Sequence, residues 1–208
     1  MAKRILVSKE LKKELKKVQR NVAKKLQLKS RDWAYFKKVG NYFIIHRIGI
    51  SFQTGSFAMD VNTRIKPYII DDIFWEVFDM ASNSQEPMSL RAVGAFTVEG
   101  LSLPDKVAKE DWEMEDLEVL SEAHEEALNL ITSFSDFEDF YAYTVENGPR
   151  IAGYDLIGML LMIHREQYQE ALQMAEGLIA KRDFGDFQNN GKWINEYIVD
   201  YCKERLGK

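Results

Sequence analysis

Two consecutive runs of alternating side chains, residues 42–52 and 57–65, constrain the fold of this chain most strongly. Successive side chains of an extended strand point to opposite faces, so alternation with a period of two predicts β structure. The segment between the runs, Gln53–Ser56, contains a glycine and predicts the turn of a β-hairpin. In this hairpin register His46 faces Thr63, and Arg47 faces Asn62.

Other local patterns place helices and strands around this hairpin. Leucines and valines recur every three or four residues over 8–28, which predicts an amphipathic helix. A strand-like run, WAYFKK, precedes a turn at Val39-Gly40-Asn41. We expect a further helix at 69–81 and another strand at Arg91–Glu99. The sheet is then antiparallel, with about four strands and a packed helix.

The C-terminal half reads as helical throughout, so the predicted fold class is α+β. Helices are expected at about 117–131, 134–147, 151–164, 167–182 and 192–206. The third and fourth resemble one tetratricopeptide-type hairpin, because Tyr168 and Ala171 have that motif's spacing. A two-helix hairpin packed on its neighbours explains the same residues without a repeat, and we favour it. The expected organisation is an α+β lobe at 1–104 and a helical lobe at 105–208, packed as one unit.

Charge is distributed very unevenly along the chain. Residues 1–40 hold 14 lysines and arginines against 3 acids, whereas the whole chain has 28 against 33. Residues 105–146 hold 14 acids and 2 lysines. An asymmetry of this kind suggests nucleic-acid, membrane or charge-paired protein contacts.

The basic surface of the N-terminal helix allows three interpretations. It consists of Lys12, Lys13, Lys16, Lys17, Arg20, Lys24 and Lys25. These side chains suit nucleic-acid phosphates, without base specificity. They also suit an anionic membrane, although the helix lacks an aromatic anchor. In the interpretation that the sequence favours, the apolar stripe packs into the fold while the lysines face the acidic 105–146 segment, in this chain or another.

A second candidate surface lies on the polar face of the predicted hairpin. Its residues are Arg47, Gln53, Asp60, Asn62 and Arg64. They share one face because they differ by even steps along each strand and pair across the hairpin. Phe43 and Ile45 lie on the same face, so we expect it to be partly covered.

Catalytic and metal-binding patterns are weak. His46 lies among apolar neighbours, and we expect a hydrogen-bonded core histidine. His124 begins HEEAL, which resembles HExxH, but Leu128 replaces the second zinc ligand. Both residues therefore favour packing roles. Asp71-Asp72 is expected to be a solvated pair, and the single cysteine, Cys202, excludes an intrachain disulfide. No catalytic residue, metal or cofactor is predicted.

These patterns favour a cytoplasmic, non-catalytic protein that binds another protein or itself, as an adaptor or immunity-like module. The acidic helices and the polar hairpin face are the expected contacts. The order of helix, antiparallel sheet and helical tail is similar to that of many small bacterial proteins, some of which neutralise toxins or act as adaptors. The alternatives are non-specific nucleic-acid binding through the basic helix, and an enzyme with a site on the polar hairpin face. No membrane contact is predicted.

Overall fold

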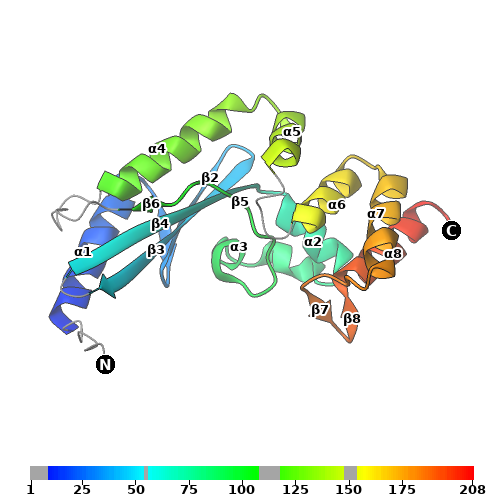
Figure 1. Ribbon diagram of the computed structural model, residues 1–208, viewed down its shortest axis with the longest axis horizontal. Helices are drawn as coiled ribbons and strands as arrows, with labels where there is room; N and C mark the ends of the chain where they lie inside the picture. Colours follow the sequence, from blue (N-terminus) through cyan, green and yellow to red (C-terminus); the bar gives the residue numbers. More distant parts are fainter. Residues whose placement is uncertain (1–8, 54–55, 108–117, 148–153) are drawn as a thin grey trace. The chain divides into compact units, whose positions relative to one another are not determined.

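The computed structural model describes residues 9–53, 56–107, 118–147 and 154–208 (Figure 1). The chain forms two compact units, and each unit contains two separate segments of the sequence. The first unit contains Met1–Ile65 and Ser102–Ser133, and the second contains Lys66–Leu101 and Phe134–Lys208. The units therefore alternate along the sequence, whereas the predicted division places one boundary near residue 104.

An antiparallel sheet is the framework of the first unit, and its strand order is β1-β2-β3-β4-β5, with β6 also paired to β4. The strands are β1 (Lys29–Arg31), β2 (Ala34–Val39), β3 (Tyr42–Gln53), β4 (Ser56–Pro67), β5 (Leu101–Ser102) and β6 (Lys106–Val107). The first three strands follow one another through tight turns. The turn between β2 and β3 was predicted, whereas strand β1 was not. Pro67 ends β4, because proline has no N–H to donate to a ladder.

The strand register agrees with the sequence pattern. Tyr35 pairs with His46 between β2 and β3, and Gly40 turns the chain between them with a φ of 56°. Between β3 and β4, His46 Nδ1 lies 2.9 Å from Thr63 Oγ1, as expected for residues facing each other. The predicted hairpin is therefore present, with His46 and Thr63 on the same buried face.

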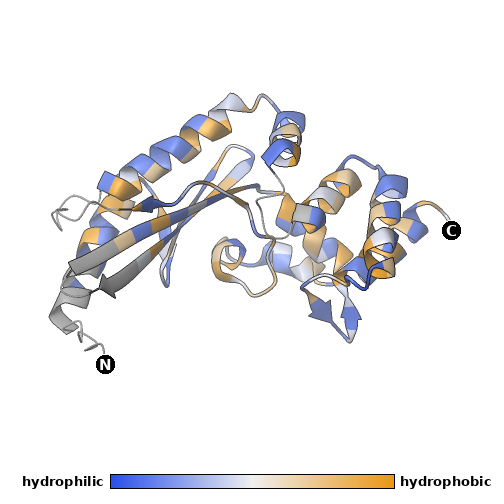
Figure 2. Cartoon of the chain, in the orientation of Figure 1, coloured by the Kyte–Doolittle hydropathy of each residue, from blue (hydrophilic) through white to orange (hydrophobic). Residues whose placement is uncertain are grey.

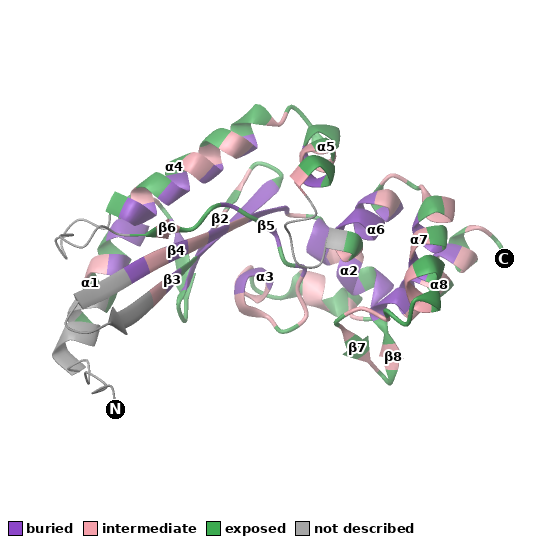
Figure 3. Cartoon of the chain, viewed as in Figure 1, coloured by how far each residue is buried: buried purple, intermediate pink, exposed green. Residues whose placement is uncertain are grey.

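Helices α1 (Lys9–Lys25) and α4 (Glu118–Ser133) complete the first unit. Both contribute to one apolar core with the sheet, whose buried members are Val22, Ala23, Leu28, Tyr35, Ile48, Met59, Val61, Val119, Leu120 and Ala123. Figures 2 and 3 show the apolar, buried side of α4 toward the sheet and its polar side outward. Burial of this face, rather than helix propensity, therefore stabilises each helix.

The end of α1 explains how the chain enters the sheet. Gln27 adopts a positive φ of 57°, and its N–H donates to the Lys24 carbonyl. The N–H of Leu28 donates to the Ala23 carbonyl at 2.7 Å. This pair of bonds is the Schellman arrangement that satisfies the last carbonyls of a helix. Leu28 then packs in the core next to the beginning of β1.

The second unit is mainly helical. It contains α2 (Ile70–Val77), the short 3-10 helix η1 (Ala81–Gln85), α3 (Leu90–Val93), α5 (Phe137–Asn147), α6 (Tyr154–His164), α7 (Tyr168–Ala180) and α8 (Ile194–Arg205). An aromatic cluster of Phe74, Phe78, Phe96, Phe187 and Tyr197 packs between α2, α8 and two loops. The α+β class with helices in the C-terminal half is therefore confirmed.

Two local predictions differ from the structure. The strand predicted at Arg91–Glu99 is wrong, because Leu90–Val93 is a helical turn and the following residues form a loop. Side chains bind the backbone of this loop, so it needs no neighbouring strand. A small hairpin, β7 (Gln188–Asn189) and β8 (Lys192–Trp193), was not predicted. Asn190 and Gly191 form its turn, and both have a positive φ. Asn-Gly is a strong sequence signal for a hairpin, but each of the two strands here has only two residues.

Candidate functional site

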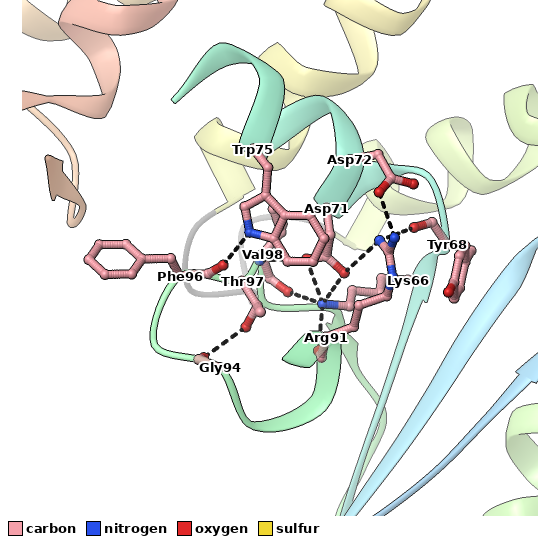
Figure 4. A network of polar contacts seen from close by, with 10 residues as sticks. All are labelled: Lys66, Tyr68, Asp71, Asp72, Trp75, Arg91, Gly94, Phe96, Thr97 and Val98. Carbon is pink, nitrogen blue, oxygen red and sulfur yellow. Dashed lines mark hydrogen bonds and ion pairs between the residues drawn. The ribbon is translucent and has the colours of Figure 1, made fainter. Parts of the chain in front are cut away.

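A buried ion pair between Lys66 and Asp71 lies in the second unit (Figure 4). Lys66 is 1% exposed at the end of β4, and Asp71 is fully buried in the first turn of α2. The Lys66 ammonium donates to Asp71 Oδ1 at 2.9 Å and to the carbonyls of Arg91 and Val98 at 3.1 and 2.7 Å. Three donors therefore meet three acceptors. The expectation that Asp71 belongs to a solvated pair is wrong, because its charge is compensated inside the fold.

Arg91 extends this network. Its guanidinium donates to the Tyr68 carbonyl at 2.9 Å and to Asp72 at 2.5 Å. It also stacks over the rings of Tyr68 and Trp75, at 4.0 and 4.8 Å from their centroids. The indole N–H of Trp75 donates to the Phe96 carbonyl at 2.6 Å. Lys66, Asp71 and Trp75 thus fasten the 94–98 loop to β4 and α2. Arg91 fastens α3 to Tyr68 and Asp72, so we assign the network a structural role.

Two histidines meet in the first unit, although 78 residues separate them. His46 Nε2 lies 3.1 Å from His124 Nδ1, and His46 Nδ1 lies 2.9 Å from Thr63 Oγ1. Burial, and then the charge of His124, lowers the pKa of His46 to about 3. Burial, and then the charge of Lys37, lowers the pKa of His124. Both rings are therefore neutral near pH 7 and connect β3 to α4, as the predicted packing roles require.

The polar hairpin face is only partly assembled. Asn62 donates to Asp105 at 2.9 Å and accepts from Arg64 Nε at 3.2 Å, so two of the predicted residues do meet. Arg47 is exposed, whereas Phe43 and Ile45 on the same face are buried, which agrees with partial cover.

Asp60, another member of that face, lies against the neighbouring strand β3. The Asp60 carboxylate lies over Gly49, where a Cβ would meet its oxygens at 2.5 Å. The side chain of Gln53 lies outside the described part of the structure. Asn62 and Arg64 therefore form hydrogen bonds within the protein, and the absence of a side chain at Gly49 leaves space for the Asp60 carboxylate.

The basic side of α1 points away from the core. Lys13, Lys16, Lys17, Arg20, Lys24 and Lys25 are exposed, and the side chain of Lys12 lies outside the described part. Four of these cations, Lys13, Lys17, Arg20 and Lys24, are spaced by four, three and four residues. This spacing places them in one row of about 16 Å along the helix. The row lies opposite the side that buries Val22 and Ala23.

The β1–β2 hairpin extends this basic side. All three residues of β1 are exposed, including Lys29 and Arg31, and Lys38 on β2 is exposed as well. Trp33 lies in the turn between the two strands and is 45% exposed. The Lys16 ammonium lies 4.9 Å from the centre of its ring, so α1 and the turn form one surface. We call this surface, with Lys13, Lys16, Lys17, Arg20, Lys24, Lys25, Lys29, Arg31 and Trp33, the basic face.

The acidic residues of α4 form a separate exposed surface. Glu118, Glu122 and Glu125 are exposed, and Glu126 pairs with Lys106 at 2.6 Å. This carboxylate raises the pKa of the Lys106 ammonium. Within the parts of the chain that the structure describes, no ion pair joins the lysines of α1 to α4. The described part of the apolar stripe predicted for α1, Val18, Val22 and Leu26, packs as expected. Pairing of its lysines with the acids of α4 is not seen among these residues, and the acids at 110–116 lie outside the described part of the structure.

The described residues provide little support for a cysteine nucleophile or a metal-binding site. Cys202 is fully buried on α8, and burial raises the pKa of its thiol to about 11, so the thiolate is scarce near pH 7. No group of three or more histidine, cysteine or acidic side chains in the described segments is placed to hold a metal ion. Nor is any of the described helices both long and apolar enough to cross a bilayer.

Sequence reasoning found the basic helix but missed three features of these sites. The Lys66–Asp71–Arg91 network and the histidine pair join residues that are distant in sequence, so no local pattern marks them. The exposure of Trp33 was also missed, because WAYFKK reads as a continuous strand. The left-handed φ of 54° at Asp32 places Trp33 in a turn instead. Comparisons of the chain with protein families, curated proteins and solved structures find no match.

Proposed function

We propose that this protein is a non-catalytic binding protein whose main contact surface is the basic face, and that its partner is nucleic acid. The observation that carries the proposal is the row of exposed cations on α1, which no described acid of α4 neutralises. Lysines and arginines in such a row attract phosphates and release their counterions. A charge row of this kind contacts backbone phosphates rather than base edges, so the expected binding is independent of sequence.

The internal charges support a binding role over catalysis. The buried network of Lys66, Asp71 and Arg91 is occupied by its own partners, and the histidines pair with each other. Neither arrangement offers an acid or base to a substrate. The proposal also places the protein in the cytoplasm, supported by the single cysteine, which leaves no intrachain disulfide to form.

Fluorescence anisotropy with labelled oligonucleotides across a salt series tests this function. If about four phosphates are neutralised, log K falls with log salt at a slope of about −3 for single strands. Lys17→Gln/Lys24→Gln removes two cations of the row and should reduce the slope by about 1.4. Lys181→Gln/Lys208→Gln is the matched control, because it makes the same charge change on exposed lysines of the second unit. Absence of binding at low salt, or equal losses in both variants, contradicts the proposal.

A second candidate function is binding of a protein partner, or of a second copy of this chain, through α4. The observation that favours it is the exposed row of Glu118, Glu122 and Glu125 on the outer side of that helix. These glutamates recur every three or four residues and suit a basic partner surface. Sedimentation at several ionic strengths tests self-association, and Glu122→Gln/Glu125→Gln should then weaken it. A monomer at all concentrations and salts excludes self-association.

A further inference from the structure

Trp33 is exposed, whereas the residues that follow it in the chain are buried. The next three residues, Ala34, Tyr35 and Phe36, are almost completely buried in β2, whereas the indole of Trp33 remains 45% exposed. The positive φ of Asp32 fixes the turn that holds it there. The backbone of Trp33 is also anchored, because its carbonyl accepts the N–H of Ile48 on β3. A large aromatic ring is thus held at the surface, on the turn between β1 and β2.

The surroundings of this ring are mainly cationic, although the exposed Asp32 precedes it in the turn. Lys16 lies 4.9 Å from the ring centre, and Lys29 and Arg31 are exposed on the strand that precedes the turn. In a protein–protein interface, the residues around such an aromatic anchor are normally apolar, and charged residues are depleted there. The composition here is instead that of single-strand binding surfaces, which combine a positive track with aromatic rings on which bases stack.

We infer that Trp33 is a stacking platform for a base of single-stranded nucleic acid whose phosphates follow the cations of α1. The inference rests on the proposed function and adds a preference to it. Bases in a duplex are already stacked on their neighbours, so they cannot use the indole without being unpaired. Single strands gain both the phosphate contacts and the stacking contact, whereas duplexes gain only the former. The structure therefore assigns this protein a preference for single strands.

The test compares a non-self-complementary 20-nucleotide single strand with its duplex, using anisotropy at low salt. Trp33→Ala should weaken single-strand binding about 5- to 150-fold, which corresponds to the usual loss of one stacked base. The affinity for the duplex should change less than about twofold. Trp33→Phe keeps a ring and should retain most of the affinity. Circular dichroism of each variant shows that the loss does not come from unfolding.

The matched control is Trp193→Phe, because Trp193 is also exposed, at 36%, but belongs to the small hairpin of the second unit. Single strands should quench tryptophan fluorescence in Trp193→Phe and quench it far less in Trp33→Phe. If single strand and duplex bind equally, or Trp33→Ala weakens both alike, the stacking inference is overturned and the proposed function stands. If neither nucleic acid binds at low salt, the proposed function fails first.

Discussion

His46 Nε2 and His124 Nδ1 lie 3.1 Å apart, so one ring must donate the proton that the other accepts. Thr63 Oγ1 occupies the remaining nitrogen of His46 at 2.9 Å. Two protonated rings cannot satisfy this contact, because each nitrogen would then be a donor. The link between β3 and α4 therefore requires that at least one ring is neutral, and burial lowers the pKa of both.

The first prediction concerns the pH dependence of stability. The pKa of His46 is about 3 in the folded protein and 6.5 when unfolded, so the unfolded chain binds more protons between these values. Its stabilising contribution is complete above pH 6.5 and is lost progressively as the pH falls toward 3. The free energy of unfolding should decrease by up to about 1.4 kcal/mol per pH unit for this histidine alone. Urea unfolding between pH 7.5 and 4.5 measures the slope.

Three variants, His124→Leu, His164→Gln and His46→Gln, distinguish the histidine pair from general acid destabilisation. His124→Leu removes one ring and leaves His46 Nε2 without that partner, so it should lower stability at pH 7.5 by about 1–3 kcal/mol. His164→Gln is the control, because His164 is exposed at the end of α6. It should leave both stability and the pH slope unchanged. Equal pH slopes in the wild type and His46→Gln would show that this contact does not control the acid response.

The second prediction concerns the Lys66–Asp71 ion pair. Lys66→Met leaves the buried carboxylate of Asp71 without its ammonium and frees the carbonyls of Arg91 and Val98. Loss of one partner of a buried pair costs about 3–5 kcal/mol. Asp71→Asn should be less costly, because the amide keeps an oxygen for Lys66 and for the Val98 N–H. Chemical denaturation of both single variants and of the double variant gives the coupling energy.

A matched exposed pair provides the comparison. Lys203 and Glu176 lie 3.0 Å apart, and both side chains are about half exposed. Lys203→Met should therefore change stability by less than about 1 kcal/mol. Similar losses for Lys66→Met and Lys203→Met would contradict the structural role of the buried network.

Local patterns predicted much of this fold, because their physical cause is local. Alternation placed the β3–β4 hairpin and paired His46 with Thr63, and the apolar repeat of α1 placed its buried side. The Arg91–Glu99 segment also reads as a strand, yet it is a turn and a loop in which the adjacent residues Arg91 and Ala92 are both buried. Its backbone is bound by Lys66, Asp71 and Trp75 rather than by a strand. Alternation reports which side chains are buried, and it does not report what satisfies the backbone.

The candidate surface was predicted only in part for the same reason. The cations of α1 could be placed by helical periodicity, since exposed positions on a helix follow from its buried stripe. The contact of Lys16 with Trp33 joins α1 to the β1–β2 turn, and no spacing in the sequence encodes it. Pairing of these cations with the acids of the 105–146 segment likewise depends on tertiary packing. Composition indicated this pairing, and no ion pair of this kind is present between the described residues of α1 and α4.

The third prediction concerns Cys202. Its thiol is fully buried, and burial raises its pKa to about 11. The thiolate is the reacting form, so a disulfide reagent at pH 8 should modify the folded protein very slowly. Addition of guanidinium should make the reaction fast, because the unfolded thiol is accessible and has its ordinary pKa. Fast, stoichiometric labelling of the folded protein would show that α8 does not cover this residue.

The fourth prediction tests the register of the β3–β4 hairpin through Gly49 and Asp60. A Cβ on Gly49 would lie 2.5 Å from both carboxylate oxygens of Asp60, so Gly49→Ala forces that side chain to rotate and should destabilise the protein by about 0.5–1.5 kcal/mol. Asp60→Ala removes the atoms that clash, and the double variant should recover most of the loss. Thermal unfolding of the two single variants and the double variant measures this coupling.

Gly177→Ala supplies the opposite expectation in the same experiment. No heavy atom lies within 4 Å of a Cβ built at this position, which is inside helix α7. The substitution should therefore stabilise the protein by about 0.5–1 kcal/mol, because alanine restricts the unfolded chain and favours the helix.

Additive effects of Gly49→Ala and Asp60→Ala would mean that these residues do not face each other. A strong positive coupling identifies them as neighbours across the two strands, in the register that also joins His46 to Thr63.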